Sequence, residues 1–223
     1  MTSSKPRSRS DRRSRRSTSR EALSESRQPV VLNAGSGAAG GAGLPPYFES
    51  WRQLRVDVNP LAEPDLVADI VDLSAIPAGS VDAVWSSHCI EHLFPHEVPR
   101  ALAEFRRVLT SDGFACLIVP DLQAIAEWIA TDRLHETIYQ SAAGPVTAHD
   151  MVWGFAPAIE QGHVAMAHRC GFTPTLFLER LNAAGFPEIV LRRRSNLELV
   201  ALVLAQVAQN SSRRETLLAA LTL

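Results

Sequence analysis

Residues 30–37 read VVLNAGSG, and residues 54–60 read LRVDVNP. Each stretch is a short apolar run that stops at a turn-forming residue, Gly35 in the first and Asn59-Pro60 in the second. Such runs predict strands. Three more follow at residues 66–70, 81–85 and 114–119. Because most of these runs are apolar on both faces, they fit a parallel sheet that is covered by helices on both sides.

Helical patterns lie between and after these runs. Residues 98–109 place their apolar side chains on one face. Further helices are expected at 122–130, at 175–184 with Gly185 as the cap, and at 211–221, with late strands at 189–191 and 197–207. This alternation predicts an α/β fold with a doubly wound, mostly parallel, Rossmann-like sheet. Residues 131–172 do not continue this alternation of strands and helices. They predict an insertion over the carboxyl edge of the sheet, where ligands bind in such folds.

Composition excludes several classes of protein. The chain has 223 residues, of which 46% are hydrophobic and 21% charged, as in ordinary globular proteins. Its three cysteines are an odd number and suggest no disulfide framework, so we expect a cytoplasmic location. No apolar run is long enough to span a bilayer, so we expect no membrane partner. Lys5 is the single lysine, which excludes a Walker loop, a Schiff base and a Tyr/Lys hydride-transfer pair within the fold.

The first 28 residues differ in charge from the rest. They hold nine basic and three acidic residues, a net charge of +6, so the remainder of the chain carries −8. Their Ser/Arg repetition lacks apolar periodicity and predicts a disordered tail over 1–28, followed by one domain over 29–223. The tail is either a solvated extension without a specific partner or an electrostatic tether to nucleic acid. The sequence does not indicate an oligomeric state.

The glycine-rich residues 35–40 match the pattern GxGxxG, and Asp57 lies 20 residues beyond Gly37. A carboxylate at the end of a second strand can accept hydrogen bonds from both hydroxyls of a cofactor ribose. The pyrophosphate of NAD also needs a helix that starts at the loop. Residues 41–46 bring further glycines and two prolines, which oppose that helix. A sulfonium cofactor needs only a close backbone approach, so the loop favours S-adenosyl-L-methionine over NAD.

Other candidate cofactor residues follow the strand ends. Asp69 is expected to accept from the adenine amino group, with Ile70 covering the ring. Ser87 ends the fourth strand beside the first, at the topological switch point where cofactor and substrate should meet. The full set of expected cofactor-binding residues is Asn33, Ala34, Gly35, Ser36, Gly37, Asp57, Val58, Asp69, Ile70 and Ser87.

The most specific stretch is SVDAVWSSHCIEHL at residues 80–93. With residues 31–37, 55–60, 68–73 and 106–120, it makes the chain resemble class I S-adenosylmethionine-dependent methyltransferases of the type 11 group. The resemblance covers roughly residues 30–120, and AHRCGFT at 167–173 is similar to a set of bacterial predicted methyltransferases. It implies a seven-stranded sheet and methyl transfer to a small-molecule or soluble acceptor.

One position departs from the group, which usually carries an acidic residue where Asn33 stands. A catalytically impaired module of the same fold, binding cofactor or scaffolding a partner, is therefore the alternative function. A nucleic-acid methyltransferase that uses the tail is less favoured, because the rest of the chain is net acidic.

His88, Glu91 and His92 form an HxxEH pattern, as in inverted zinc peptidases. That motif requires a long helix, whereas Pro95 and Pro99 interrupt this segment. We therefore expect neither a zinc peptidase nor a bound metal. Two interpretations stay open. Glu91 and His92 cap the next helix or form hydrogen bonds within the site. Alternatively, His88 or His92 borders the methyl acceptor and acts as a general base, the catalytic role we assign to them.

The acceptor side is expected to draw on the carboxyl edge and the insertion. Asp121 follows the fifth strand and either binds acceptor or caps the helix beginning at Leu122. The remaining candidates for the acceptor pocket lie within the insertion, because binding residues favour such loops. They are His149, His163, His168 and Arg169.

Overall fold

The computed structural model describes residues 27–38, 43–207 and 211–221. In this part of the chain seven strands form one sheet in the order β3-β2-β1-β4-β5-β9-β8. The strands β1 to β5 pair in parallel, while β9 runs antiparallel to both β5 and β8. The predicted doubly wound sheet is confirmed. Its strands are β1 (Val30–Ala34), β2 (Arg52–Asp57), β3 (Leu66–Val67), β4 (Val81–Ser87), β5 (Leu109–Pro120), β8 (Glu188–Arg193) and β9 (Glu198–Leu204).

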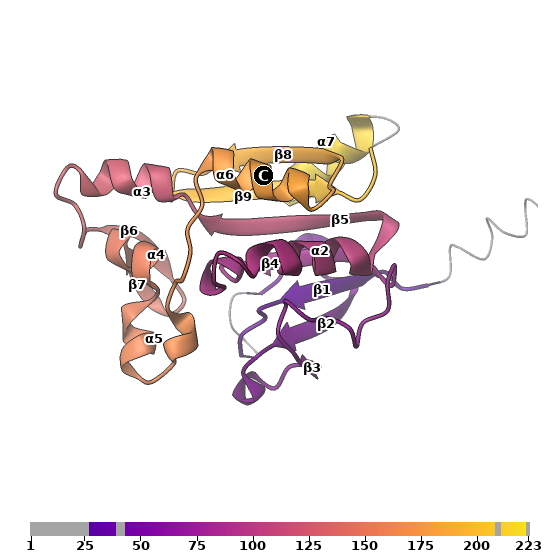
Figure 1. The fold of residues 1–223 in the computed structure, drawn as a ribbon, viewed down its shortest axis with the longest axis horizontal. Coiled ribbons are helices and arrows are strands. Elements are labelled where there is room, and N and C mark those ends of the chain that lie inside the picture. Colours follow the sequence, from indigo (N-terminus) through magenta and orange to yellow (C-terminus); the bar gives the residue numbers. More distant parts are fainter. Residues whose placement is uncertain (1–26, 39–42, 208–210, 222–223) are drawn as a thin grey trace, which may run out of the picture.

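Helices cover both faces of this sheet (Figure 1). On one face lie α2 (Val98–Val108) and α6 (Pro174–Ala183), and Phe105 of α2 is fully buried against the sheet. On the other face α7 (Ser211–Ala220) buries Leu217. The helices expected at 98–109, 175–184 and 211–221 are thus present, with ends that differ by one or two residues.

The connection from β1 to β2 carries little regular structure. Its described part forms a short 3-10 helix, η2 (Pro46–Phe48), in which Pro46 is tolerated at the first position. Tyr47, Phe48 and Trp51 pack against Phe114 of β5, with ring centroids 6.1–6.2 Å apart. These aromatic rings cover part of the sheet face that also carries α7.

Residues 131–172, which we call the insert lobe, follow α3 (Leu122–Ile129). Figure 1 shows the lobe beyond the ends to which the arrows of β1, β4 and β5 point, as expected. Ile125 of α3 packs against Val146 and Met151 of the lobe in a small separate core. The elements of the lobe are β6 (Thr137–Ser141), β7 (Gly144–Thr147), α4 (Ala148–Trp153), α5 (Ala156–Glu160) and η5 (Val164–Met166).

Two details differ from the expectations. The third strand, expected over 66–70, is only two residues long, because the chain turns at Asp69, whose carboxylate accepts the Val71 N–H at 3.0 Å. The tail was expected to be disordered over 1–28. Residues 1–26 lie outside the described residues, but Arg27 pairs with Asp82 at 2.7 Å and Gln28 donates to the Ser50 carbonyl, so these two residues belong with the domain. Among the described helices, none is long and apolar enough to cross a bilayer.

Candidate functional site

The glycine turn after β1 is tied to the end of β2. Gly35 and Gly37 have positive φ angles of 69° and 61°, which glycine adopts without strain. The Gly35 and Ser36 N–H groups donate to the Val56 carbonyl at 2.9 and 3.1 Å. Asp57 accepts the Gly37 N–H on Oδ2 at 2.8 Å. A carboxylate has about four lone-pair positions, so Asp57 keeps capacity for the two hydroxyls of a ribose.

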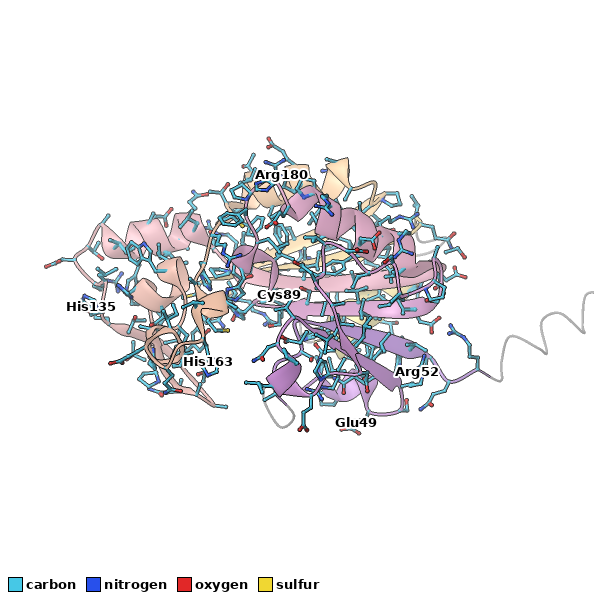
Figure 2. All side chains as sticks on the ribbon, turned by 60° about the horizontal axis from the view of Figure 1, so that its bottom comes forward. Glu49, Arg52, Cys89, His135, His163 and Arg180 are labelled. Carbon is cyan, nitrogen blue, oxygen red and sulfur yellow. The ribbon has the colours of Figure 1, made fainter. Side chains whose placement is uncertain are left out.

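Cys89, just after β4, lies against the same turn. A Cβ placed on Gly35 would be 2.5 Å from the Cys89 Sγ, so only glycine allows this approach. Burial, and then the negative charges of Glu91, Asp57 and Asp69, raise the pKa of the Cys89 thiol. The glycine turn therefore meets both Cys89 and Asp57 at the switch between β1 and β4. Figure 2 shows Cys89 in the middle of the molecule, between the sheet and the insert lobe.

The other expected cofactor residues lie near these strand ends. Asn33 and Ala34 are buried at the end of β1, and Ile70 is buried after β3. Asp69 is exposed, Ser87 is partly buried at the end of β4, and Val58 is 53% exposed. An exposed apolar side chain next to Asp57 is available to cover a ligand ring.

His88 begins the turn after β4 with a φ of 49°, and its N–H donates to the Ile118 carbonyl at 2.9 Å. Its ring lies between two carboxylates, with Nδ1 3.2 Å from Glu91 Oε1 and Nε2 3.0 Å from Glu198 Oε1. Burial alone would lower the pKa of His88, but the bonds to Glu198 and Glu91 outweigh it and raise the pKa to about 10. A ring protonated at neutral pH cannot accept a proton, so this geometry disagrees with the general-base role expected for His88.

Glu91 is almost fully enclosed, with 1% of its surface exposed. Burial would raise the pKa of its carboxyl, but the hydrogen bond and the charge of His88 hold it below the ordinary value. Its Oε1 is used by His88, whereas the buried Oε2 has no hydrogen-bond partner among the described residues. An unsatisfied buried carboxylate oxygen is costly and needs an explanation.

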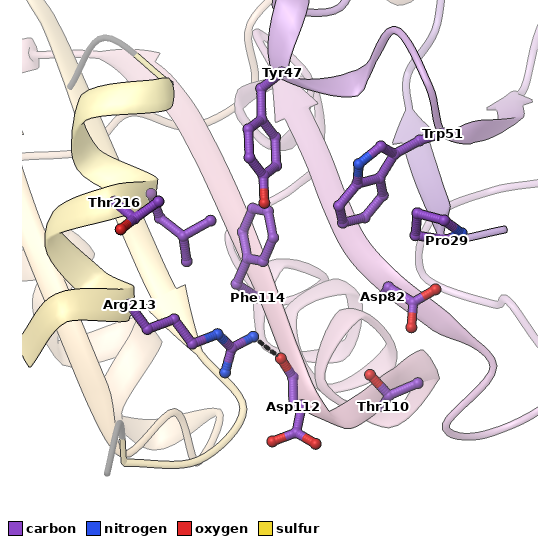
Figure 3. A pocket seen from close by; sticks show the side chains of 10 residues that line it. Pro29, Tyr47, Trp51, Asp82, Thr110, Asp112, Phe114, Arg213 and Thr216 are labelled. Carbon is purple, nitrogen blue, oxygen red and sulfur yellow. Dashed lines mark hydrogen bonds between the residues drawn. The ribbon is translucent and has the colours of Figure 1, made fainter. Parts of the chain in front are cut away.

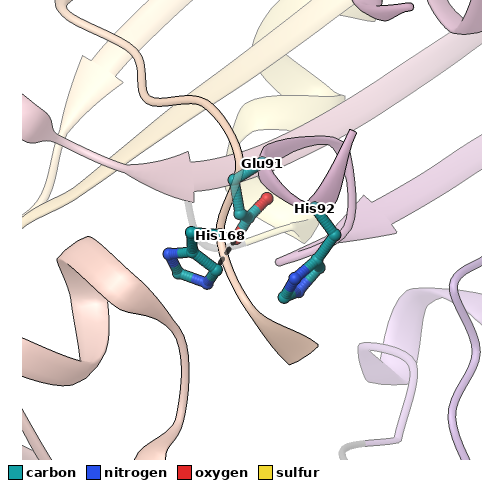
Figure 4. A group of neighbouring side chains, drawn as sticks. All are labelled: Glu91, His92 and His168. Carbon is teal, nitrogen blue, oxygen red and sulfur yellow. Dashed lines mark ion pairs between the residues drawn. The ribbon is translucent and has the colours of Figure 1, made fainter. Parts of the chain in front are cut away.

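The last segment of the insert lobe docks beside Glu91. The N–H groups of Arg169 and Cys170 both donate to the Glu91 carbonyl, at 2.9 and 3.2 Å. This backbone clamp brings the ring of His168 to within 4.8 Å of the ring of His92, centroid to centroid (Figure 4). Burial lowers the pKa of His168, so its ring is neutral at neutral pH.

The expectation that Glu91 and His92 either cap the next helix or bond within the site is resolved. Helix α2 begins after Glu97, and no side chain caps it. Glu91 bonds to His88, and His92 Nδ1 lies 3.3 Å from the Ala167 carbonyl. Both side chains therefore bond within the site, and the capping interpretation is wrong.

Asp121 is a structural residue in this geometry. Its Oδ1 accepts the Gln123 and Ala124 N–H groups at 3.2 Å, which caps α3. Its Oδ2 pairs with Arg193 at 2.5 Å, and the residue is 1% exposed. The capping interpretation fits these contacts, and they leave little of the carboxylate for an acceptor.

Two of the four expected acceptor residues of the insert lobe, His168 and Arg169, line one cavity, whereas His149 and His163 do not. His149 stacks with His135 and Trp153, with centroids 5.5 and 4.8 Å apart. His163 is exposed, and Figure 2 shows it on the lobe, away from Cys89. Arg169 is exposed and lies over the Phe94 ring at 4.8 Å. Of the four, His168 is the one that meets Glu91 and His92.

Sequence reasoning missed two residues of the site. Glu198 starts β9 and reaches His88 across 110 residues of sequence. In the sequence, the only feature that points to Glu198 is its charge at the start of an apolar run. Tyr139 of β6 was also missed, and burial, followed by the charges of Glu198 and Glu91, raises the pKa of its hydroxyl to about 12.

Cavities lie in the described part of the molecule, and two of them bear on the location of the site. One, of about 240 Å³, lies between α4, the start of α3 and the segment that carries His168, and Glu91 forms part of its wall. The other, of about 490 Å³, lies between Tyr47, Trp51 and α7 (Figure 3). The larger cavity contains none of the expected cofactor or acceptor residues, so size alone does not mark the reaction site.

Comparison with known proteins agrees with this geometry. Residues 48–117 match the family model described as a methyltransferase domain. The match begins after the glycine turn and therefore covers a shorter stretch than the resemblance noted from the sequence. No curated protein matches the chain by sequence.

Solved structures share the fold at low identity. A protein from Pyrococcus horikoshii, PH0226, is 16% identical, with 88% of this chain and 92% of that chain covered and a TM-score of 0.52. A Thermotoga maritima protein described as a possible histamine N-methyltransferase is 12% identical, with 84% and 86% covered and a TM-score of 0.50. The CurJ carbon methyltransferase is 14% identical, with 83% and 50% covered and a TM-score of 0.52.

Residues 48–117 therefore resemble a methyltransferase domain, and the seven-stranded sheet has the fold expected of the class I S-adenosylmethionine-dependent methyltransferases that the sequence resembles. S-adenosyl-L-methionine, the cofactor expected from the glycine turn, is the methyl donor of this class.

Proposed function

We propose that the chain transfers a methyl group from S-adenosylmethionine to a small-molecule or soluble acceptor that enters beside the insert lobe. The proposal includes one catalytic domain that begins at Arg27, the insert over 131–172 as its acceptor side, a separate tail that ends before Arg27 and a cytoplasmic location. The observation that carries it is the contact of the Gly35–Gly37 turn with both Cys89 and Asp57.

Asp57 is assigned to the ribose of the cofactor. Its carboxylate is already oriented by the N–H groups of Gly37 and Asn59, each at 2.8 Å, so it needs little rearrangement to accept two hydroxyls. Asp69 and Ile70 are assigned to the adenine. Residues 33–37 and Ser87 are assigned to the methionine half of the cofactor. Asn33 is neutral and adds no charge toward the cofactor amino group, and the nearby carboxylates of Glu91 and Glu198 are balanced by the charged His88 and Arg194.

Bound cofactor would supply an electrophilic methyl group on a positively charged sulfur. Because that charge disappears in the transition state, the protein's main tasks are alignment of the acceptor and exclusion of water. The cavity of about 240 Å³ lies next to Glu91, which is two residues from Cys89, so an acceptor held there is close to the cofactor side of the sheet. The charged ring of His88 holds Glu91 and Glu198 in place and does not take up a proton.

The test is calorimetric binding of S-adenosylhomocysteine. Asp57→Ala is expected to weaken binding at least tenfold. Glu49→Gln removes an exposed carboxylate from the β1–β2 connection and should leave the affinity unchanged. Equal affinity in Asp57→Ala and the unmodified protein would refute the ribose assignment.

A module that binds cofactor without turnover remains the second candidate, because Asn33 is neutral and only the short η2 stands between β1 and β2 in the described residues. Transfer of a labelled methyl group into a cell extract discriminates the two. Repeated absence of transfer by protein that binds the cofactor normally would favour the module.

A further inference from the structure

Glu91, His92 and His168 bring one carboxylate and two imidazoles together below the carboxyl edge of the sheet (Figure 4). One potential ligand atom from each lies within 4.8 Å of the others. Zinc bonds of about 2.0–2.2 Å place tetrahedral ligands about 3.4 Å apart, so the three groups would need to close by roughly an ångström. Side-chain rotation alone provides movements of this size.

The neighbours of His92 and His168 determine which nitrogen of each ring carries the proton. His92 Nδ1 lies 3.3 Å from the Ala167 carbonyl, and His168 Nδ1 lies 2.9 Å from the Met151 carbonyl. A carbonyl oxygen only accepts, so each Nδ1 carries the proton and each Nε2 of a neutral ring has a free lone pair. A backbone carbonyl on the second nitrogen is the usual support of a metal-binding histidine.

Glu91 supplies the negative charge that such a site needs. Its Oε2 is buried and has no hydrogen-bond partner among the described residues, while its Oε1 is held by His88, itself fixed by Glu198. A ligating carboxylate that is oriented from behind by a hydrogen-bond donor fits a supported metal site. A cation on Oε2 would satisfy the buried atom that the protein leaves unsatisfied.

Backbone hydrogen bonds hold the segments that carry these three side chains next to one another. Glu91 and His92 lie in the single turn η4 (Ile90–His92), and the N–H groups of Arg169 and Cys170 clamp the His168 segment to the Glu91 carbonyl. The Cys170 Sγ lies 3.5 Å from the Ile90 carbonyl, so its S–H is engaged with the backbone and the donor set is nitrogen and oxygen. The HxxEH pattern had paired His88 with His92, but both ring nitrogens of His88 are used by Glu91 and Glu198, and His168 takes its place.

We propose that Glu91, His92 and His168 bind one divalent transition-metal ion, with a further coordination position open to the cavity of about 240 Å³ that Glu91 and His168 line. Two histidines and one glutamate with an open position are the donor set of catalytic zinc sites. The open position suits an oxygen or nitrogen atom of the methyl acceptor, which the ion would orient. That role rests on the proposed function, whereas metal binding does not.

The test measures metal binding directly, without cofactor or acceptor. Tag-free protein is analysed for first-row metals by mass spectrometry, then stripped with a chelator and titrated with Zn²⁺ by calorimetry. We expect one ion per chain with a dissociation constant below about 1 µM. His168→Ala should weaken binding by at least 100-fold, since loss of a supporting residue alone typically costs 10- to 100-fold. His163→Ala, an exposed histidine of the same lobe, should bind as the unmodified protein does.

A second readout guards against variants that misfold. Saturating Zn²⁺ should raise the melting temperature of the unmodified protein and of His163→Ala, because a ligand that binds only the folded state stabilises it. In His168→Ala, circular dichroism should stay native while the Zn²⁺-dependent shift disappears. Less than one ion per chain, or equal affinity in His168→Ala and His163→Ala, would overturn the site. Failure of methyl transfer with intact Zn²⁺ binding would count against the proposed function and leave the metal site standing.

Discussion

Substituting Gly35 by alanine tests the close approach between the glycine turn and Cys89. Gly37 is the matched control, because its φ of 61° is close to the 69° of Gly35 but a Cβ there meets no atom of the described residues within 4 Å. Alanine in the left-handed region costs about 1–2 kcal/mol. Reduced freedom of the unfolded chain returns about 0.4–1 kcal/mol. Gly37→Ala should therefore lower the free energy of unfolding by about 1 kcal/mol or less.

Gly35→Ala adds a collision to the same backbone cost. Its Cβ would lie 2.5 Å from the Sγ and 2.9 Å from the Cβ of Cys89, so the turn or the segment after β4 must shift. Such overpacking costs about 1–3 kcal/mol. The expected total loss is about 2–4 kcal/mol, and cofactor affinity should fall with it because the turn and η4 separate.

Urea denaturation followed by circular dichroism measures both variants. The Cys89→Ala background removes the sulfur contact but keeps the Cβ at 2.9 Å, so the penalty of Gly35→Ala should shrink there without vanishing. Equal losses for the two glycine variants, or the same Gly35→Ala penalty with and without Cys89, would refute the proposed contact.

Two further predictions concern charge and capping. The Arg107 guanidinium holds the pKa of Glu104 below its ordinary value. The ionised carboxylate therefore stabilises the fold at pH values above the unfolded pKa of about 4.3. This stabilisation is lost as the pH falls through the lower pKa of the folded state. Glu104→Gln should thus be less stable than the unmodified protein at pH 7, and the gap in urea unfolding should close toward pH 3; a constant gap would contradict this. Asp121→Ala should lower the free energy of unfolding by about 1–3 kcal/mol, because it removes the α3 cap and leaves Arg193 unpaired. Asp121→Asn can still cap α3, so its free energy of unfolding should fall by less. Equal losses in thermal unfolding would show that the cap is not what Asp121 provides.

The sheet could be predicted because its strands are marked locally. Residues 30–34 and 81–87 are apolar runs, and each stops at a turn, so hydrophobicity and backbone chemistry agree. The β3 strand was overestimated because 66–70 is apolar enough for a strand, but the hydrogen bond from Val71 to Asp69 turns the chain after Val67. The local hydrophobic pattern does not show whether a longer strand or the turn at Asp69 is more stable.

The contact between the glycine turn and Asp57 could likewise be predicted from local spacing, because both lie at the ends of neighbouring strands of one sheet. Their assignment to a cofactor stays a prediction. The acceptor side depended on contacts that spacing does not reveal. His168 reaches Glu91 through backbone hydrogen bonds across about 75 residues, and Glu198 reaches His88 across 110. His88 was expected to act as a base because histidine titrates near neutrality, but two carboxylates around its ring reverse that expectation.

The position of β9 between β5 and β8 has a consequence for how the protein is made. Ribosomes release the N-terminus first, so His88 and Glu91 leave the exit tunnel long before Glu198 is translated. Until β9 is inserted, β5 presents an open edge to other nascent chains. Premature termination just upstream of Glu198 would therefore yield a product that lacks an anion of the reaction centre and is also prone to associate through its unpaired strand.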